Sequence, residues 1–280
     1  MKTLGYYNGK IDELDKITIP MLDRACYFGD GVYDVTFSRN YKVYKLREHV
    51  ERIFHSAALL KIFPKITPDE LYDLVEELVK KLDSNEQWVY FQFSRGTDFR
   101  NHAFPENATP NLWIMLKPAK IKDTYRQLRV ITREDTRALH CNIKSLNLLP
   151  SVLATQACVD AGVDECILYR GDIVTECAHS NVSILKNGAL ITHPADNHIL
   201  AGTGRAHLMD ACHHFEIPVI ERPYTLDELK DADEVILTSA SALCMRIVEV
   251  DGTSVGQKAP HTLKTLQDYL LDDFLTETAE

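Results

Sequence analysis

Apolar residues recur every three or four positions in the stretch 49–61, which is the spacing of one face of a helix. The stretch 67–70 reads Thr-Pro-Asp-Glu, so a capping residue, a first-turn proline and first-turn acids stand in the order that begins a helix. We therefore predict helices over 49–61 and 68–82. In the second half of the chain, helices are expected over 151–161, 205–215 and about 263–275.

Strands are predicted where β-branched and aromatic residues alternate, most clearly over 32–37. Arg39-Asn40 then turns this strand into a second one over 42–44, which makes a hairpin. The other predicted strands cover 17–20, 88–94, 111–117, 128–132, 166–169, 182–185, 235–238 and 247–250. Together these elements predict mixed, mostly antiparallel α+β structure without an internal repeat.

The chain of 280 residues is long enough for two modest domains. A stretch at 119–123, directly after Pro118, has the composition of a linker. We expect a smaller N-terminal domain over 1–118, a linker over 119–123 and a larger C-terminal domain over 124–280.

Composition excludes several classes of function. The formal net charge is −10 with scattered basic residues, which argues against nucleic acid or an anionic membrane as the main partner. No apolar run approaches the roughly 20 residues of a membrane span. The first residues lack a signal-peptide pattern and the seven cysteines form no Cys-x-x-Cys pair, so we expect a cytoplasmic protein with reduced thiols. Cys212-His213-His214 are adjacent helical residues that point apart, so no metal site is expected.

A single lysine, Lys144, lies in the stretch Cys141–Pro150 among apolar and small polar residues, with no acidic residue nearby. Partial desolvation in such company would turn its ammonium into a usable amine nucleophile. A surface lysine in a connecting turn would have the same local composition. The stretch alone therefore leaves both interpretations open.

Four short motifs, in order along the chain, carry a family resemblance: Ile143–Asn147, Glu165–Leu168, Val174–Glu176 and Ser180–Val182. Their residues resemble the fold-type IV pyridoxal 5'-phosphate (PLP) enzymes, which include D-amino-acid aminotransferases, branched-chain aminotransferases and aminodeoxychorismate lyase. The resemblance runs from about Asn8 to Asp251. It implies a two-domain α+β fold with PLP in the interdomain cleft.

The resemblance implies that Lys144 is the catalytic residue, which forms the Schiff base with PLP and then moves the substrate Cα proton. Glu176 matches a glutamate beside the pyridine nitrogen, where an ionised carboxylate keeps that nitrogen protonated. Arg52 matches the family's phosphate-binding arginine. Without the resemblance, the sequence around Glu176 would fit an ordinary hairpin glutamate equally well, and that around Arg52 would fit an ordinary solvated helix arginine.

A second phosphate contact is expected at 200–205, because glycine-rich backbone at a helix N-terminus presents N–H groups to an anion. The family commonly has a threonine where this chain has Gly204, so one hydroxyl contact to the phosphate would be missing, and Thr203 could supply it instead. The family also often has a hydroxyl where this chain has Ala240. The cofactor-binding residues expected from this comparison, besides Arg52, Lys144 and Glu176, are Ser180, Asn181, Leu200, Thr203, Gly204, Ser239 and Ala240.

Substrate choice is expected to depend on Arg100 and His102, which stand two apart and can face the same side of an extended loop. The pair resembles the α-carboxylate trap of D-amino-acid aminotransferases, where the loop reaches in from the partner subunit, and Tyr33 matches the tyrosine that completes it. A polar surface loop is the alternative. Arg246 could favour an acidic substrate side chain or point to solvent.

We therefore expect a homodimeric enzyme that moves the amino group of a D-amino acid (D-alanine, D-glutamate or D-aspartate) to a 2-oxo acid such as 2-oxoglutarate or pyruvate, by a ping-pong mechanism. A branched-chain L-amino-acid aminotransferase or an aminodeoxychorismate lyase on the same fold is the alternative. A non-enzymatic binder that keeps the fold is a more distant one. Visible absorbance of added PLP, and assays with D-alanine, L-leucine and aminodeoxychorismate, separate these hypotheses.

Overall fold

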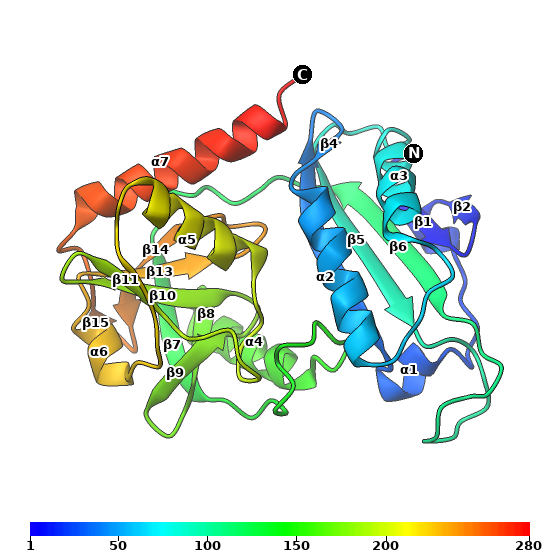
Figure 1. Cartoon of the computed structure of the whole chain (residues 1–280), viewed down its shortest axis with the longest axis horizontal. Helices are drawn as coiled ribbons and strands as arrows, with labels where there is room; N and C mark the ends of the chain where they lie inside the picture. The colour runs from blue at the N-terminus through cyan, green and yellow to red at the C-terminus, as the bar shows by residue number, and fades with distance from the viewer. The chain divides into compact units, whose positions relative to one another are not determined.

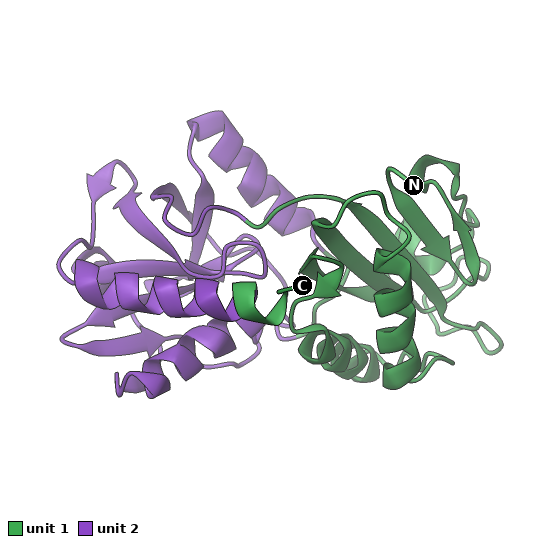
Figure 2. Cartoon of the chain, turned by 90° about the horizontal axis from the view of Figure 1, so that it is seen from above, with its two compact units in different colours: residues 1–121, 143–147, 275–280 green, residues 122–142, 148–274 purple.

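The computed structural model describes all residues, 1–280, and divides into two compact units (Figure 2). Unit 1 comprises 1–121, 143–147 and 275–280, and unit 2 comprises 122–142 and 148–274. The chain first passes from unit 1 to unit 2 after Ile121, inside the stretch 119–123 that sequence analysis names as a linker. The assignment of 124–280 to one domain differs from this division, because 143–147 and 275–280 belong to unit 1.

Unit 1 is built on a six-stranded, wholly antiparallel sheet in the order β2-β1-β6-β5-β3-β4. Two helices, α2 and α3, lie along one face of this sheet (Figure 1). The elements are β1 (Leu4–Tyr7), β2 (Lys10–Asp12), the 3-10 turn η1 (Leu14–Lys16), α1 (Arg24–Phe28), β3 (Gly31–Arg39), β4 (Lys42–Val43), α2 (Leu46–Leu59), α3 (Pro68–Val79), β5 (Gln87–Ser94) and β6 (Asn111–Pro118).

The core of unit 1 follows from the apolar spacing of its helices. Val50 and Ile53 of α2 are fully buried and share one hydrophobic cluster with Phe91 of β5. Thr67 caps α3 in a reciprocal capping box with Glu70, as the sequence predicts. The predicted strand over 17–20 is wrong: its first residue, Ile17, packs over Gly5 of β1, and 17–20 pairs with no strand.

Unit 2 is built on a nine-stranded mixed sheet in the order β12-β11-β10-β13-β14-β7-β8-β9, with β15 paired to β14. Three of its pairs are parallel, namely β7 with β8, β7 with β14, and β11 with β12. The elements are β7 (Leu128–Glu134), α4 (Leu149–Ala161), β8 (Glu165–Arg170), β9 (Ile173–Cys177), β10 (Asn181–Lys186), β11 (Ala189–Thr192), α5 (Thr203–His214), β12 (Val219–Glu221), α6 (Leu226–Lys230), β13 (Glu234–Thr238), β14 (Met245–Val250), β15 (Thr253–Ser254) and α7 (Pro260–Glu277), whose last turn falls in unit 1.

The predicted mixed, mostly antiparallel α+β structure is confirmed. Central strands β10 and β13 are almost entirely buried, which agrees with the apolar residues that make up most of each strand. Sequence analysis missed the shortest elements, such as α1 and β12. None of the helices has the length and apolarity that crossing a bilayer requires. The cytoplasmic location stays a prediction.

Candidate active site

The segment around Lys144 belongs to unit 1 because it extends the edge of β3. β4 pairs only with Ser38 and Arg39, so the first half of that edge is open. There the N–H of Tyr33 donates to the carbonyl of Lys144 at 3.0 Å, and the N–H of Leu146 donates to the carbonyl of Gly31 at 3.0 Å. A Cβ on Gly31 would lie 2.7 Å from Cδ1 of Leu146 and 2.4 Å from the carbonyl oxygen of Phe93 on β5, so the close approach of the Lys144 segment depends on glycine.

The Lys144 side chain lies over an aromatic ring of the same unit. Its Nζ is 4.5 Å from the ring centroid of Tyr33, and the Tyr33 ring stacks on Tyr90 with centroids 5.6 Å apart. The Lys144 backbone N–H donates to Oγ of Ser56 on α2 at 3.3 Å. The structure thus fixes the lysine backbone from two sides and brings together Lys144 and Tyr33, two of the residues singled out from sequence.

Arg52 is held by a buried carboxylate. Asp34 on β3 has no exposed surface and accepts from Arg52 Nε at 2.8 Å and Nη2 at 2.7 Å, while Nδ1 of His49 lies 2.7 Å from the same carboxylate. Burial alone would raise the pKa of Asp34, but the charges of Arg52 and His49 outweigh it and hold that pKa well below its usual range. This two-bond pair fixes the orientation of the guanidinium.

Arg100 and His102 meet at one ring of unit 1. The guanidinium carbon of Arg100 lies 4.9 Å from the ring centroid of Phe28, and the His102 ring lies 4.9 Å from the same centroid. Arg24 approaches this ring as well, at 4.8 Å. Both Arg100 and His102 are exposed. Phe28, which sequence analysis missed, is therefore the platform that the pair shares.

Buried arginines anchor the loop that carries this pair. Arg24 donates to Asp30 at 2.7 Å and to the carbonyl of Asn101 at 2.6 Å, and Arg95 donates to Asp30 at 2.8 Å. The guanidinium of Arg95 also stacks on Phe104 at 3.7 Å. The loop borders a hollow of about 240 Å³ that is lined by Arg24, Phe28, Gly29, Asp30, Leu60, His102, Phe104 and Asn147.

In unit 2, Glu176 on β9 is a buried carboxylate with donors on both oxygens. Oε1 accepts from Nη1 of Arg137, while Oε2 accepts from Nδ2 of Asn181 at 2.8 Å and from the N–H of Leu200 at 3.1 Å. Asn181 also donates to the carbonyl of Leu200 at 2.9 Å. The structure thus brings together three residues singled out from sequence, Glu176, Asn181 and Leu200.

Arg137 is a residue of this group that sequence analysis missed. It makes a bidentate pair with Asp135 at 3.0 and 2.9 Å and donates to the carbonyl of His198 at 3.1 Å. Burial alone would lower the pKa of Arg137, but hydrogen bonds to Asp135 and the charge of Glu176 raise it, so the guanidinium stays charged. The only sequence signal is an Asp-x-Arg pair just before the lysine stretch, and local composition does not distinguish it from a surface pair.

The turn before α5 lies close to the side chain of Asn181, and the start of α5 lies close to the backbone of Ser239. A Cβ on Gly202 would lie 2.0 Å from Oδ1 of Asn181, and a Cβ on Gly204 would lie 3.1 Å from the backbone N of Ser239. Gly204 is therefore explained by the neighbouring loop, which leaves little room for a threonine. Gly202 is the N-cap of α5, a twelve-residue helix, and the Ser239 backbone lies against the first turn of that helix.

Three other residues have less direct placements. The Ser180 hydroxyl donates to Glu165 at 3.3 Å and lies 3.2 Å from His179. Ala240 lies in the turn after β13, next to Ser239. Arg246 points neither to solvent nor to an open pocket, because it pairs with the fully buried Glu234 at 3.1 Å.

A sequence profile of the family "Amino-transferase class IV" matches residues 31–250. The chain belongs to the class IV aminotransferases. It is 37% identical over 280 residues to the D-alanine aminotransferase of Listeria monocytogenes, with 98% of this chain and 96% of the relative covered. It is 35% identical to the D-alanine aminotransferase of Bacillus licheniformis, with 100% and 99% covered.

Solved structures agree on the fold. The branched-chain amino acid aminotransferase from Escherichia coli has a TM-score of 0.89 at 20% identity, covering 100% of this chain and 97% of that chain. The branched-chain aminotransferase from Thermoproteus uzoniensis has a TM-score of 0.87 at 22% identity, covering 98% and 97%. At these identities the structures support the predicted fold class and say nothing further of substrate.

Proposed function

We propose that this chain is a PLP-dependent aminotransferase that moves the amino group of a D-amino acid to a 2-oxo acid such as 2-oxoglutarate or pyruvate. The observation that carries the proposal is the similarity, over nearly the full length, to relatives named D-alanine aminotransferase. Arg100 and His102 support it further, since a cation and a second donor on one platform suit an α-carboxylate.

The residues present fit PLP in three respects. Glu176 is a buried carboxylate fixed by three donors, as a partner of a protonated ring nitrogen needs to be. The glycine-rich start of α5 and the Ser239 backbone suit a phosphate. Oγ1 of Thr238, beside Ser239, is buried without a hydrogen-bond partner, as expected of an atom that binds a polar ligand.

Bound PLP supplies an electron sink that stabilises negative charge at the substrate Cα. We propose that Nζ of Lys144 would hold the cofactor, and that the same nitrogen, when free, would take up the substrate Cα proton as a base and then give that proton back as an acid. Glu176 would hold a proton on the ring nitrogen, and Arg137 would keep Glu176 ionised. Arg52 and the N–H groups of Thr203 and Gly204 would bind the phosphate.

Lys144 belongs to unit 1 and Glu176 to unit 2. We propose further that the enzyme is a homodimer in which Arg100 and His102 serve the partner's substrate. Their exposure within the chain supports this role. Exposed apolar side chains, including Phe99 in unit 1 and Leu149 and Leu153 of α4 in unit 2, are suited to burial against a second copy.

The test compares amino donors in an aminotransferase assay with one preparation of cofactor-loaded protein. With 2-oxoglutarate as acceptor, D-alanine should yield glutamate far faster than L-leucine does, and no pyruvate should form from aminodeoxychorismate. A clear preference for L-leucine or for aminodeoxychorismate would overturn the substrate assignment while leaving the cofactor assignment intact. Protein that takes up no PLP would overturn both.

A further inference from the structure

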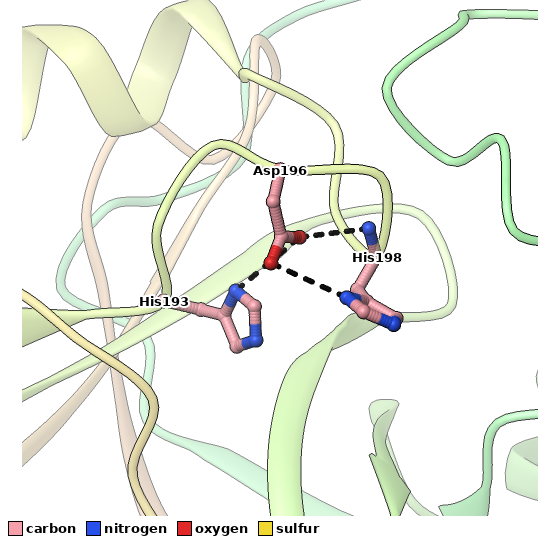
Figure 3. A group of neighbouring side chains, drawn as sticks. All are labelled: His193, Asp196 and His198. Atoms are coloured by element: carbon pink, nitrogen blue, oxygen red, sulfur yellow. Dashed lines mark hydrogen bonds and ion pairs between the residues drawn. The ribbon is translucent and has the colours of Figure 1, made fainter.

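A compact group of possible metal ligands lies in the loop between β11 and α5. His193, Asp196 and His198 each offer one ligand atom, and these atoms all lie within 4.8 Å of one another. Figure 3 shows both imidazole rings turned toward the carboxylate of Asp196. The Nδ1 atom of His193 is 3.8 Å from Oδ1, and the Nδ1 atom of His198 is 3.2 Å from Oδ2.

Accessibility differs among the three side chains in a way that suits an ion. The His193 side chain is almost completely buried, whereas those of Asp196 and His198 are 41% and 35% exposed. One side of the group is therefore fixed against protein, and the other is open to solvent. An open side allows an ion to enter and to keep one or more water ligands.

The loop is held from outside the group, so the ligand atoms are largely preorganised. The carbonyl of His193 accepts from Arg205 at 2.9 Å, and the carbonyl of His198 accepts from Arg137 at 3.1 Å. Between them, the carbonyl of Asn197 accepts from the N–H of Cys141 at 3.0 Å. A loop tied at three carbonyls loses little conformational entropy when its side chains close on an ion.

The two arginines do not leave a net positive field at the loop. Arg205 pairs with Glu221 at 2.6 Å, and Arg137 pairs with both Asp135 and Glu176. Their charges are compensated nearby, and the negative charge of Asp196 is the one that faces the two imidazoles.

We propose that His193, Asp196 and His198 bind a divalent transition-metal ion of the class that prefers imidazole and carboxylate ligands, such as Zn²⁺, Co²⁺ or Ni²⁺. Two nitrogens and one oxygen would leave the remaining positions to water. The separations of 3.2 and 3.8 Å are close to the spacing of neighbouring ligands around an ion with bonds of about 2.0–2.2 Å, so only small side-chain shifts are needed.

Binding at these atoms sets a condition on the ring protons. Each Nδ1 faces an acceptor, Asp196 for both rings and additionally the carbonyl of Pro194, 3.0 Å from His193. In the absence of an ion, a proton on Nδ1 of His193 would satisfy the carbonyl of Pro194, and a proton on Nδ1 of His198 would satisfy Asp196. Metal binding requires neutral rings with the proton on Nε2 and the Nδ1 lone pair on the ion. The competing interpretation is that no ion binds, that His198 is hydrogen-bonded to Asp196, and that His193 is hydrogen-bonded to the carbonyl of Pro194.

The experiment is titration of the PLP-loaded protein with Co²⁺ and, separately, Zn²⁺ at slightly alkaline pH, in a buffer that does not chelate. Co²⁺ should saturate at about one ion per chain and give weak visible d–d bands without an intense thiolate charge-transfer band. Zn²⁺ should compete with Co²⁺ and raise the Tm, because an ion that binds only the folded chain stabilises it.

Two variants change the accessible ligands and leave buried His193 in place. The carboxylate of Asp196 accepts a hydrogen bond from the backbone N–H of His198 at 2.8 Å, and Asp196→Asn keeps the side-chain shape and an oxygen acceptor for that bond. His198→Ala removes one imidazole. Each should weaken Co²⁺ binding at least about tenfold and remove the Zn²⁺-dependent rise in Tm. His213→Ala is the matched control, since it removes an exposed histidine of α5 outside the group and should leave both readouts unchanged.

Three results would overturn the proposal. The parent could show no saturable Co²⁺ binding, or Asp196→Asn and His198→Ala could both bind Co²⁺ as tightly as the parent. Loss of Co²⁺ binding in His213→Ala alone would also overturn it. A thiolate band would assign the ion to a cysteine such as Cys141 and would also contradict the proposal. Because binding and Tm are measured without substrate, these outcomes are independent of whether the chain transfers amino groups.

Discussion

Asn181 and Gly202 approach so closely that a Cβ on Gly202 would lie 2.0 Å from Oδ1 of Asn181. The other end of the same amide donates to Glu176. The turn before α5 and the buried carboxylate are therefore positioned by one side chain.

Gly202→Ala should displace Asn181 and with it the hydrogen bond to Glu176. We expect a loss of about 1–3 kcal/mol in the free energy of unfolding, the usual range for overpacking, and weaker PLP binding. Urea unfolding and PLP titration measure the two effects. In an Asn181→Ala background the clash is absent, so the same glycine substitution should cost much less. Equal costs in both backgrounds would show that Asn181 is not what requires glycine here.

Arg137→Gln should destabilise the folded chain, because it leaves the buried carboxylates of Asp135 and Glu176 without their shared cation. Breaking a buried ion pair costs about 3–5 kcal/mol, which urea unfolding can resolve. Arg222→Gln, which removes an arginine from a solvent-accessible pair with Glu228, should cost no more than about 1 kcal/mol. Similar losses in the two variants would contradict the structural role given to Arg137.

Stability should fall on acidification in a way that depends on Asp34. Its pKa is held below the ordinary value of about 3.9, so the unfolded chain takes up this proton first as the pH falls. The stabilisation is present above about pH 4 and is lost as the pH falls through the lower, folded pKa. The free energy of unfolding, measured between about pH 5 and 3, should therefore decrease more steeply for the parent than for Asp34→Asn. Parallel curves would be inconsistent with the buried Asp34–Arg52 pair.

Phe28→Ala should raise KM for the amino acid by about tenfold, because Arg100 and His102 lose the ring on which both rest and each contact is worth about 1 kcal/mol. The visible absorption of bound cofactor should not change, and Phe28→Tyr should restore KM. Steady-state kinetics with D-alanine measure this. A fall in kcat with KM unchanged would point to a general structural defect instead.

Arg100→Ala should reduce kcat/KM for D-alanine by about two to three orders of magnitude, since a buried substrate carboxylate would lose a charged partner worth about 2–4 kcal/mol. A primary amine without a carboxylate should react at an unchanged rate. Arg47→Ala, at an exposed arginine of the same unit, serves as control. If Arg100→Ala retains full activity with D-alanine, the carboxylate is bound elsewhere.

Long periodic elements could be predicted from sequence, and the reasons are local. The helix predicted over 68–82 begins where its capping residue and first-turn proline predict, and the alternation over 32–37 lies within β3. The membership of 143–147 in unit 1 could not be predicted, because it depends on backbone hydrogen bonds to the open edge of β3, about 110 positions earlier in the chain. The strand over 17–20 failed because local composition does not indicate whether a partner strand is available.

For the candidate site, residues with a family motif were found and those defined only by contact were missed. Glu176, Asn181 and Leu200, which the resemblance singles out, are joined by hydrogen bonds, while their role in cofactor binding stays a prediction. Arg137 and Phe28 have no motif of their own, and their importance comes from the long-range contacts that they make with Glu176 and with the loop that carries Arg100.

The central claim is that Nζ of Lys144 holds the cofactor and moves the substrate proton. The most direct measurement is a single-turnover experiment in which D-alanine is added to PLP-loaded protein and to Lys144→Ala, while visible absorption and release of pyruvate are followed. The parent should lose its visible band and release about one pyruvate per chain in the absence of a 2-oxo acid. Lys144→Ala should show neither change. If Lys144→Ala releases pyruvate as fast as the parent, another group moves the proton and the account of this site is wrong.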